Sequence, residues 1–243
     1  MDLRGKTALV SGGARRDGRA IAVALAGAGA NLVIHDDAEQ LDAEGTRDAI
    51  RSAGGEVRLV AGDLTRRDHV EHVVTSAIAA FGGVDILVNS AGIVPHTPVD
   101  TLSAAQWEHT LTVNVKGPCF LAIRLGRHMM DRGAGTIVNI ADWAGVRPYR
   151  GYLAYCVSKA GVMAMTKGLA TALAPDVRVN CVSPRPLFAA GPPTAAQTGP
   201  ASPALRNGMG TSEAVARMVL FLATGGDGAT GGIYVVDGGR LNA

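Results

Sequence analysis

Residues 7–18, TALVSGGARRDG, join a short apolar run to a glycine turn and then to a helix-like segment. A strand, a tight turn and a helix in this order are typical of the first unit of a nucleotide-binding sheet. Gly12 permits the sharp bend and Gly18 permits close packing of the helix on the strand, while the N–H groups at the helix start favour a phosphate. Arg16 occupies the place of a middle glycine, so the stretch predicts a cofactor turn with one altered position.

Apolar runs alternate with helix-period segments along most of the chain, which indicates a parallel sheet covered on both faces. The candidate strands are Thr7–Val10, Asn31–His35, Val57–Ala61, Asp85–Asn89, Thr136–Ile140, Arg178–Val182 and Ile233–Val236, and the candidate helices lie near 19–28, 39–53, 67–81, 104–131, 152–174 and 212–223. We therefore predict an α/β protein with a single Rossmann-fold domain over residues 1–243 and a doubly wound sheet of seven parallel strands.

Two local patterns refine this outline. Ser103 and Gln106 are spaced as in a capping box ahead of the helix near 104–131. Residues 184–210 are rich in Pro, Gly, Ala and Ser, which predicts either a lid over the substrate or a disordered segment.

Composition narrows the classes of protein and partner. Hydrophobic residues make up 47% of the chain and charged residues 18%, which favours a packed soluble protein over a disordered one. No apolar run approaches the roughly 18 residues of a membrane span, and the first residues do not resemble a secretory signal, so we expect a cytoplasmic protein. A net charge of +2 without a basic stripe gives no indication of nucleic acid binding.

The three cysteines do not form a pattern that suggests a metal site. Cys119, Cys156 and Cys181 are an odd number, they lack CxxC spacing, and no His/Cys cluster accompanies them. These features argue against a disulfide framework and against zinc. We interpret them as small buried thiols.

Polar and small residues follow four of the predicted strands, at the edge where such folds bind ligands. Asp36 ends the second strand, where a carboxylate accepts hydrogen bonds from the adenosine ribose and repels the extra phosphate of NADP; a solvated acidic residue is the alternative. This favours NAD(H) and leaves NADP(H) open. The third and fourth strands are followed by further candidate cofactor contacts, namely Asp63, Leu64, Asn89, Ala91 and Gly92.

The stretch 137–161, IVNIADWAGVRPYRGYLAYCVSKAG, contains the candidate catalytic residues. Tyr155 and Lys159 are four apart in a helix-period segment, so their side chains lie on one face. An ammonium beside a phenol favours the phenolate and brings its pKa closer to the working range for proton transfer.

Together with Asn114, the pair resembles the motifs of the short-chain dehydrogenase/reductase family. The matching segments are SGGARRDG, Asp63-Leu64, NSAG, VNVKG, Tyr155-x-x-x-Lys159, RVNCVSP and YVVDGG, and they span nearly the whole chain. The resemblance implies NAD(P)-dependent hydride transfer and a homotetramer or homodimer. It also implies that Tyr155 is the general acid or base, that Lys159 binds the nicotinamide ribose and lowers the tyrosine pKa, and that Asn114 holds a proton-relay water. The segment from Pro184 onward would cover the nicotinamide and the substrate.

One position departs from the family pattern. Most members carry a serine thirteen residues before the tyrosine, where this chain has Asp142. An ionised carboxylate cannot donate a hydrogen bond, and about 4 Å from an alkoxide it would oppose the charge by roughly 1 to 4 kcal/mol. Asp142 therefore indicates reduction of a C=N bond, whose positive form a carboxylate stabilises, or else a protonated carboxyl in an alcohol or ketone oxidoreductase. A structural cap in an inactive, regulatory nucleotide-binding homologue is the third interpretation.

The combination of Arg16 and Asp142 resembles that in the pteridine reductases of this family, in which the arginine reaches toward pterin and pyrophosphate. The alternative is that the Arg16 side chain points into solvent and has no binding role. Val94 stands where those enzymes carry an aromatic residue, and Pro184-Arg185-Pro186 replaces the usual Pro-Gly. Trp143 and Tyr152 are candidates either for a flat substrate site or for a subunit interface. From the sequence we predict hydride transfer to a pterin-like or cyclic C=N substrate, with an alcohol or ketone substrate as the first alternative.

Overall fold

The computed structural model describes residues 2–37, 43–184, 211–239 and 241. Within these ranges seven strands form one parallel sheet in the order β3-β2-β1-β4-β5-β6-β7. The strands are β1 (Thr7–Ser11), β2 (Asn31–Asp36), β3 (Val57–Ala61), β4 (Ile86–Asn89), β5 (Gly135–Ile140), β6 (Val177–Pro184) and β7 (Ile233–Val236). The order reverses between β1 and β4, which confirms the doubly wound sheet predicted from the sequence.

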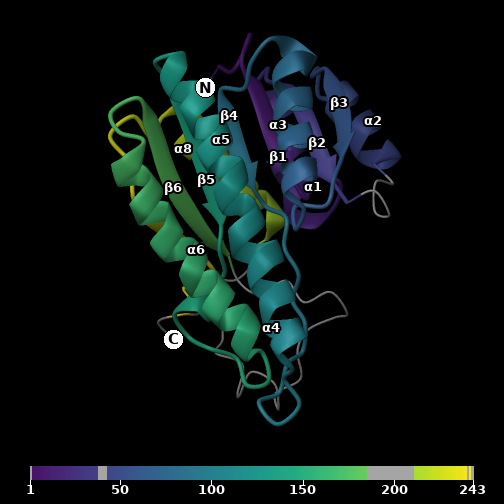
Figure 1. Ribbon diagram of the computed structural model, residues 1–243. Coiled ribbons are helices and arrows are strands. Elements are labelled where there is room, and N and C mark those ends of the chain that lie inside the picture. The colour runs from purple at the N-terminus through teal and green to yellow at the C-terminus, as the bar shows by residue number, and fades with distance from the viewer. Residues whose placement is uncertain (1, 38–42, 185–210, 240, 242–243) are drawn as a thin grey trace.

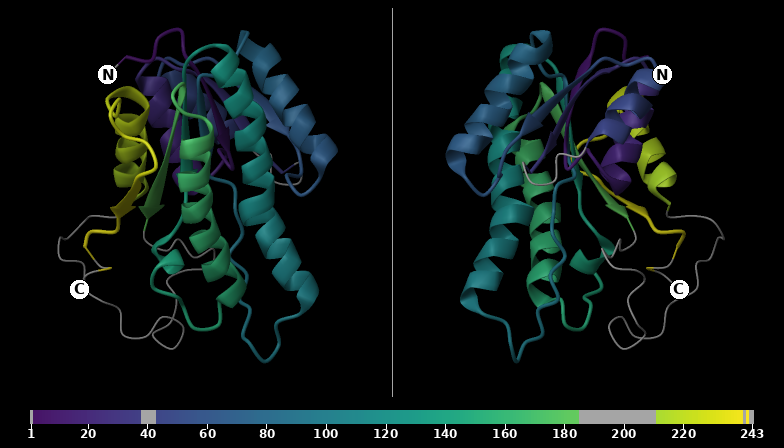
Figure 2. Two further views of the ribbon diagram at one scale, coloured as in Figure 1. Left: turned by 60° about the vertical axis from the view of Figure 1, so that its left-hand side comes forward. Right: turned by 90° about the vertical axis from the view of Figure 1, so that its right-hand side faces the viewer.

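Helices cover both faces of this sheet (Figures 1 and 2). They are α1 (Arg16–Gly27), α2 (Glu44–Ser52), α3 (Arg67–Phe81), α4 (Ala104–Leu111), α5 (Gly117–Asp131), α6 (Leu153–Ala172) and α8 (Ser212–Thr224). Figure 1 shows α3, α5 and α6 in front of the sheet, whereas α1 and α8 pack on the other face. None of the described helices is long and apolar enough to cross a bilayer.

Each face has its own apolar core, because side chains alternate along every strand. In β1, Val10 packs against Ile21 and Leu25 of α1, while the neighbouring Leu9 faces the opposite core with Leu121 of α5. All of these side chains are fully buried. The sheet is thus held from both sides, and the carboxyl ends of its strands are fixed relative to one another.

The predicted helix near 104–131 is continuous but not uniform. Residues Thr112–Lys116 between α4 and α5 form a π-helical turn, a feature that hydrophobic periodicity does not reveal. The predicted capping box is confirmed, since Ser103 Oγ accepts from Gln106 N and Gln106 Oε1 accepts from Ser103 N. Residues 185–210, which hold nearly all of the expected lid, and residues 38–42, at the start of a predicted helix, lie outside the described ranges.

Candidate active site

A cavity of about 640 Å³ lies at the carboxyl edge of the sheet. It brings together twelve of the predicted site residues: Gly12, Arg16, Gly18, Asp36, Asp63, Leu64, Ala91, Gly92, Asp142, Tyr155, Lys159 and Pro184. The predicted residues Asn89 and Asn114 are buried and do not belong to the described lining. The cavity extends from Asp36, at the end of β2, to Tyr155 and Lys159 of α6.

The turn after β1 has the backbone geometry that a phosphate site requires. Gly12 has φ 63°, and a Cβ there would lie 2.8 Å from the Cα of Ala91. A Cβ on Gly18 would collide with the carbonyl oxygen of Gly12. No side chain caps the first turn of α1 through the N-cap position, Arg15. Helix N–H groups at the cavity edge, approached closely through glycine backbone, fit the pyrophosphate of a dinucleotide.

Arg16 is the first residue of α1, three positions earlier than predicted for this helix, and it has φ 51°. This left-handed conformation favours glycine and costs another L-residue roughly 1–2 kcal/mol. The side chain is exposed and borders the cavity beside Arg15. The backbone therefore retains the shape of a glycine turn, while the residue adds a guanidinium at the cavity rim.

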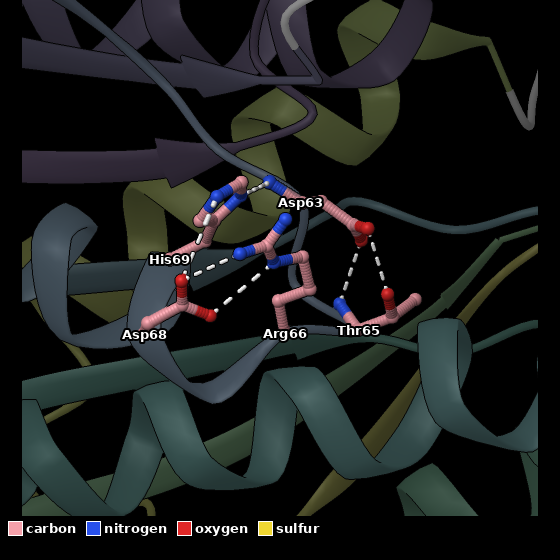
Figure 3. Close-up of polar contacts among 5 residues, drawn as sticks. All are labelled: Asp63, Thr65, Arg66, Asp68 and His69. Carbon is pink, nitrogen blue, oxygen red and sulfur yellow. Dashed lines mark hydrogen bonds and ion pairs between the residues drawn. The ribbon is translucent and has the colours of Figure 1, made fainter.

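The end of the cavity beside β1, β2 and β3, which we call the nucleotide end, contains acidic residues whose surroundings differ. Asp36 is buried, borders the cavity, and accepts a hydrogen bond from the backbone N–H of Asp37. Asp63 accepts from the backbone N–H and the hydroxyl of Thr65, each at 2.8 Å (Figure 3). Burial raises the pKa of Asp63, but these hydrogen bonds outweigh it and hold the pKa below the ordinary value of 3.8. Asp63 is thus an ionised acceptor at the cavity edge.

Two residues that the sequence did not single out support this end. His69 Nδ1 accepts a hydrogen bond of 3.0 Å from the backbone N–H of Asp63, which fixes the turn after β3 (Figure 3). His35 borders the cavity and its Nε2 lies 2.8 Å from the carbonyl oxygen of Gly62. Burial lowers the pKa of His35, so the ring is neutral and Nε2–H donates to Gly62. Neither histidine belongs to a recognisable motif.

Asn89 and Asn114 form hydrogen bonds at the end of β4 and in the segment that follows it. Asn89 Nδ2 donates to the carbonyl of Pro118 and to Asn139. Asn114 lies in the π-helical turn, where its Oδ1 accepts from the N–H of Ile93 and its Nδ2 donates to the carbonyl of the same residue. Asn114 Nδ2 also donates to Ser158 Oγ at 2.9 Å. The structure therefore shows both asparagines as supports of the cavity wall.

The catalytic end is built on a buried carboxyl group. Asp142 follows β5 and caps the 3₁₀ turn Trp143–Gly145, since its Oδ1 accepts from the N–H of Ala144 at 2.7 Å. Its Oδ2 accepts a hydrogen bond of 2.9 Å from the hydroxyl of Tyr155. The cap that the sequence suggested is thus present, and the same carboxyl group also contacts the predicted general acid or base.

The electrostatics of this group differ from the expectation that Lys159 would favour a phenolate. Burial, followed by the charge and hydrogen bond of Asp142, raises the pKa of Tyr155 well above 10. Burial also raises the pKa of Asp142 above 3.8, against the hydrogen bond from Ala144. Lys159 Nζ lies 5.8 Å from the centre of the Tyr155 ring and donates to the carbonyl oxygen of Ile140 at 3.0 Å. Tyr155 therefore keeps its proton here, and Asp142 is its immediate acceptor.

Trp143 and Tyr152 do not border the cavity formed by the described residues. They are 8% and 6% exposed and pack into an aromatic cluster with Tyr149. The interpretation that they line a flat substrate site is therefore not supported by this part of the chain. Val94, at the position of the missing aromatic residue, does border the cavity and packs against the same cluster.

The thiols and acidic groups do not form a metal centre in the described part of the chain, where no group of three or more His, Cys, Asp or Glu could hold an ion. Cys156 and Cys181 are buried and Cys119 is half-buried, and all three are free. The prediction of small buried thiols is confirmed for Cys156 and Cys181 and is wrong for Cys119.

Comparisons with known proteins agree with this geometry. The family model described as enoyl-(acyl carrier protein) reductase matches residues 14–240. An uncharacterized oxidoreductase of Thermotoga maritima is 34% identical over 250 residues, covering 98% of both chains. The D-threitol dehydrogenase of Mycolicibacterium smegmatis is 38% identical over 186 residues, covering 75% of this chain and 70% of its own. The structure of NAD⁺-bound xylitol dehydrogenase superimposes with a TM-score of 0.86 at 28% identity, covering 97% of this chain and 98% of that one.

Proposed function

The chain belongs to the short-chain dehydrogenase/reductase family and is an oxidoreductase, and from that premise we propose that it interconverts a secondary alcohol and its ketone with NAD(H). The observation that carries this proposal is the 2.9 Å hydrogen bond from the Tyr155 hydroxyl to Asp142 Oδ2. A phenol that reaches the cavity and is backed by a buried carboxylate can accept a proton from an alcohol without becoming a free phenolate.

The proposed proton route uses both groups in sequence. When an alcohol is oxidised, Tyr155 takes the proton of the substrate hydroxyl while its own proton passes to Asp142 Oδ2. When bound, a nicotinamide dinucleotide would supply the hydride acceptor for the carbon that carries this hydroxyl. In ketone reduction both Asp142 and Tyr155 start protonated, Tyr155 gives its proton to the forming alkoxide, and Asp142 replaces it.

This route removes the charge conflict that Asp142 presents. A carboxylate facing an alkoxide is unfavourable, but here Asp142 is neutral whenever negative charge develops on the substrate oxygen. Burial raises the pKa of Asp142, so this carboxyl group takes up a proton more readily than an exposed aspartate does. Burial lowers the pKa of Lys159, whereas the nearby Asp142 raises it. At the cavity wall, Lys159 is positioned to donate to a ribose hydroxyl.

The residues of the nucleotide end support NAD(H) as the cofactor. Gly12, Gly18 and the first turn of α1 fit the pyrophosphate, and Asp63 offers an ionised acceptor further along the cavity. Asp36 would accept hydrogen bonds from the adenosine ribose and repel a phosphate in that place. The exposed Arg15 and Arg16 oppose this repulsion, so we expect a preference for NAD(H) and not complete exclusion of NADP(H).

Reduction of a C=N bond is the second candidate. Asp142 favours it, because a buried carboxylate stabilises a protonated nitrogen. Two of the similar proteins, D-threitol dehydrogenase and xylitol dehydrogenase, are named for alcohols. The closeness to pteridine reductases predicted from Arg16 and Asp142 stays a prediction. Alcohols therefore come first. The homotetramer or homodimer and the cytoplasmic location also stay predictions.

The purified protein should be tested in both directions. NAD⁺ and NADP⁺ would be offered with xylitol, threitol, glycerol and a set of secondary alcohols, and NADH with the matching ketones, a dihydropterin and a cyclic imine. We expect NAD⁺-dependent oxidation of alcohols and the reverse reaction with ketones. Turnover confined to the dihydropterin or the imine would replace this proposal with the second candidate.

The cofactor preference has a separate test in Asp36→Ala. We expect the ratio of kcat/KM for NAD⁺ to that for NADP⁺ to fall at least about tenfold, because a ribose hydrogen bond and a repulsive charge are both lost. Asp37→Ala is the matched control. Asp37 also borders the cavity, but it is exposed, so its loss should change the ratio less than the loss of the buried Asp36. A wild type that already prefers NADP⁺ would contradict the role of Asp36.

A further inference from the structure

Tyr149 is a second phenol in contact with Asp142. It lies in the segment between the 3₁₀ turn and α6 and is 6% exposed. Its hydroxyl donates a hydrogen bond of 3.0 Å to Asp142 Oδ1, and its backbone N–H donates to the thiol sulfur of Cys156, next to Tyr155. The side chain of Tyr149 thus binds Asp142, which follows β5, and its backbone binds Cys156 of α6.

The two oxygens of Asp142 have different partners. Oδ1 accepts two hydrogen bonds, from the N–H of Ala144 and from the Tyr149 hydroxyl. Oδ2 accepts from the Tyr155 hydroxyl. A carboxylate oxygen offers about two lone-pair sites, and the N–H of Ala144 and the Tyr149 hydroxyl occupy both of these sites on Oδ1. Oδ2 is the oxygen that remains able to exchange a proton.

We infer that Tyr149 is a positioning residue that holds Asp142 so that only Oδ2 exchanges a proton with Tyr155. The inference rests on the proposed alcohol–ketone reaction. It adds Tyr149 as a support for Asp142 and Tyr155, the two residues that move the proton. Tyr149 itself transfers no proton in this scheme. Its hydrogen bond stabilises the charged carboxyl group and sets which oxygen faces the catalytic phenol.

The ring of Tyr149 is held so that its hydroxyl keeps this direction. Its centre lies 6.2 Å from that of Trp143 in a tilted arrangement, and 6.4 Å from that of Tyr152 in an edge-on arrangement. Aromatic rings packed in this way resist rotation of the side chain. The aromatic residues that the sequence suggested for substrate binding therefore have a different use, which is to orient the phenol that orients Asp142.

The charged and titratable groups around Asp142 come from several elements. Tyr155 and Lys159 face it from α6, and Tyr149 faces it from the preceding loop. Cys156 of α6 and Asp17 of α1 act on Tyr155 in turn. Burial is the largest influence and disfavours the carboxylate, while the hydrogen bonds and Lys159 favour it. Removal of the Tyr149 hydroxyl should therefore make Asp142 easier to protonate.

The test is Tyr149→Phe, which removes one hydroxyl and keeps the ring. In alcohol oxidation the reactive form has an ionised Asp142, so kcat rises with pH as Asp142 loses its proton. We expect the midpoint of this rise to move up by about 1 pH unit, because one hydrogen bond to the charged carboxyl group is lost. At a pH below the midpoint, kcat should therefore fall about tenfold. The KM for NAD⁺ should stay the same.

Two controls separate positioning from packing. Tyr152→Phe removes a hydroxyl from the same cluster and should leave the midpoint where it is. In an Asp142→Asn background, Tyr149→Phe should have no effect on the pH profile, because the group that it tunes is gone. A loss of activity in Tyr149→Phe with an unchanged midpoint would mean that Tyr149 is only a packing residue, and would overturn the inference.

A direct titration keeps this test independent of turnover. In protein labelled with ¹³C at the aspartate carboxyl carbons, the Asp142 signal is the one lost in Asp142→Asn, and its midpoint should be about 1 pH unit higher in Tyr149→Phe than in wild type. If Tyr149→Phe does not fold, the wild-type protein can be labelled with ¹³C at the tyrosine ζ-carbons. The chemical shift of the Tyr149 ζ-carbon should then change with pH at the same midpoint as that of the Asp142 carboxyl carbon. Equal midpoints in the first measurement, or independent ones in the second, would refute the role of Tyr149 even if alcohol oxidation is established.

Discussion

The two ends of the cavity differ in burial and in the groups that they present. At the nucleotide end, glycine backbone and exposed charges leave room for a ligand, as Gly12 and Arg16 illustrate. At the catalytic end, the functional groups are buried and tied to one another, as Asp142 and Tyr155 illustrate. The first end offers space and charge, whereas the second consists of hydrogen-bonded groups that are buried. Substitutions at the two ends should therefore separate binding from turnover.

The largest effect is expected at the catalytic end. Tyr155→Phe removes the group that takes the alcohol proton and should lower kcat by about 10²- to 10⁴-fold, the usual contribution of general acid–base catalysis. The dissociation constant of NAD⁺, measured by fluorescence titration, should change little because Lys159 and the glycine turn remain. Tyr234→Phe, on β7 away from the cavity lining, is the matched loss of a phenol hydroxyl. Weaker NAD⁺ binding together with an unchanged kcat would reverse the assignment of the two ends.

A smaller effect, with the opposite pattern, is expected at the nucleotide end. Arg16→Gly relieves a left-handed backbone and should raise the free energy of unfolding by about 1 kcal/mol, while NAD⁺ binds a few-fold more weakly because a cation near the pyrophosphate is lost. Arg15→Gly is the matched control, because Arg15 has φ –144° and gains no such relief. It should lower the free energy of unfolding by about 0.5–1 kcal/mol. Equal stability changes in urea titrations of the two variants would show that Arg16 is unstrained.

The smallest effect concerns stability alone. Burial lowers the pKa of His35 from 6.5, so below pH 6.5 the unfolded chain binds a proton that the folded protein resists. The free energy of unfolding should therefore fall as the pH drops below 6.5, by up to about 1.4 kcal/mol per pH unit for this one group. His35→Gln should flatten that slope, whereas His72→Gln, exposed on α3, should not. If the free energy of unfolding changes with pH equally in His35→Gln and in wild type, His35 does not contribute to the loss of stability at low pH.

The sequence predicted the fold and the nucleotide end more completely than the catalytic end, for a physical reason. Apolar runs and glycine spacing are local signals, and they led to the seven strands within one or two residues at each end, to Gly12 and to Gly18. Tyr155 and Lys159 also have a local signature, since one helical turn separates them. The partners of Asp142 do not, because Tyr149 reaches it only after the intervening loop has folded back.

Charge was the property least accessible from the sequence. The pairing of Tyr155 with Lys159 predicted a phenolate, but burial and the contact with Asp142 raise the pKa of Tyr155. Burial follows from tertiary packing and cannot be obtained from spacing along one helix. The sequence shows the unusual Asp142, but it does not show that the two carboxyl oxygens of this residue have different hydrogen-bond partners.

The pH profile of alcohol oxidation in Asp142 variants tests the central claim most directly, which is that Asp142 receives the proton of Tyr155. In wild type, kcat should rise with pH as Asp142 ionises. Asp142→Asn cannot accept that proton, and should lose about 10²-fold in kcat together with the rise. Asp142→Ser, which has the residue most of the family carries at this position, should keep more of the activity and still lack the rise. If Asp142→Asn retains the wild-type rate and the wild-type profile, the proton does not pass through Asp142 and the account is contradicted.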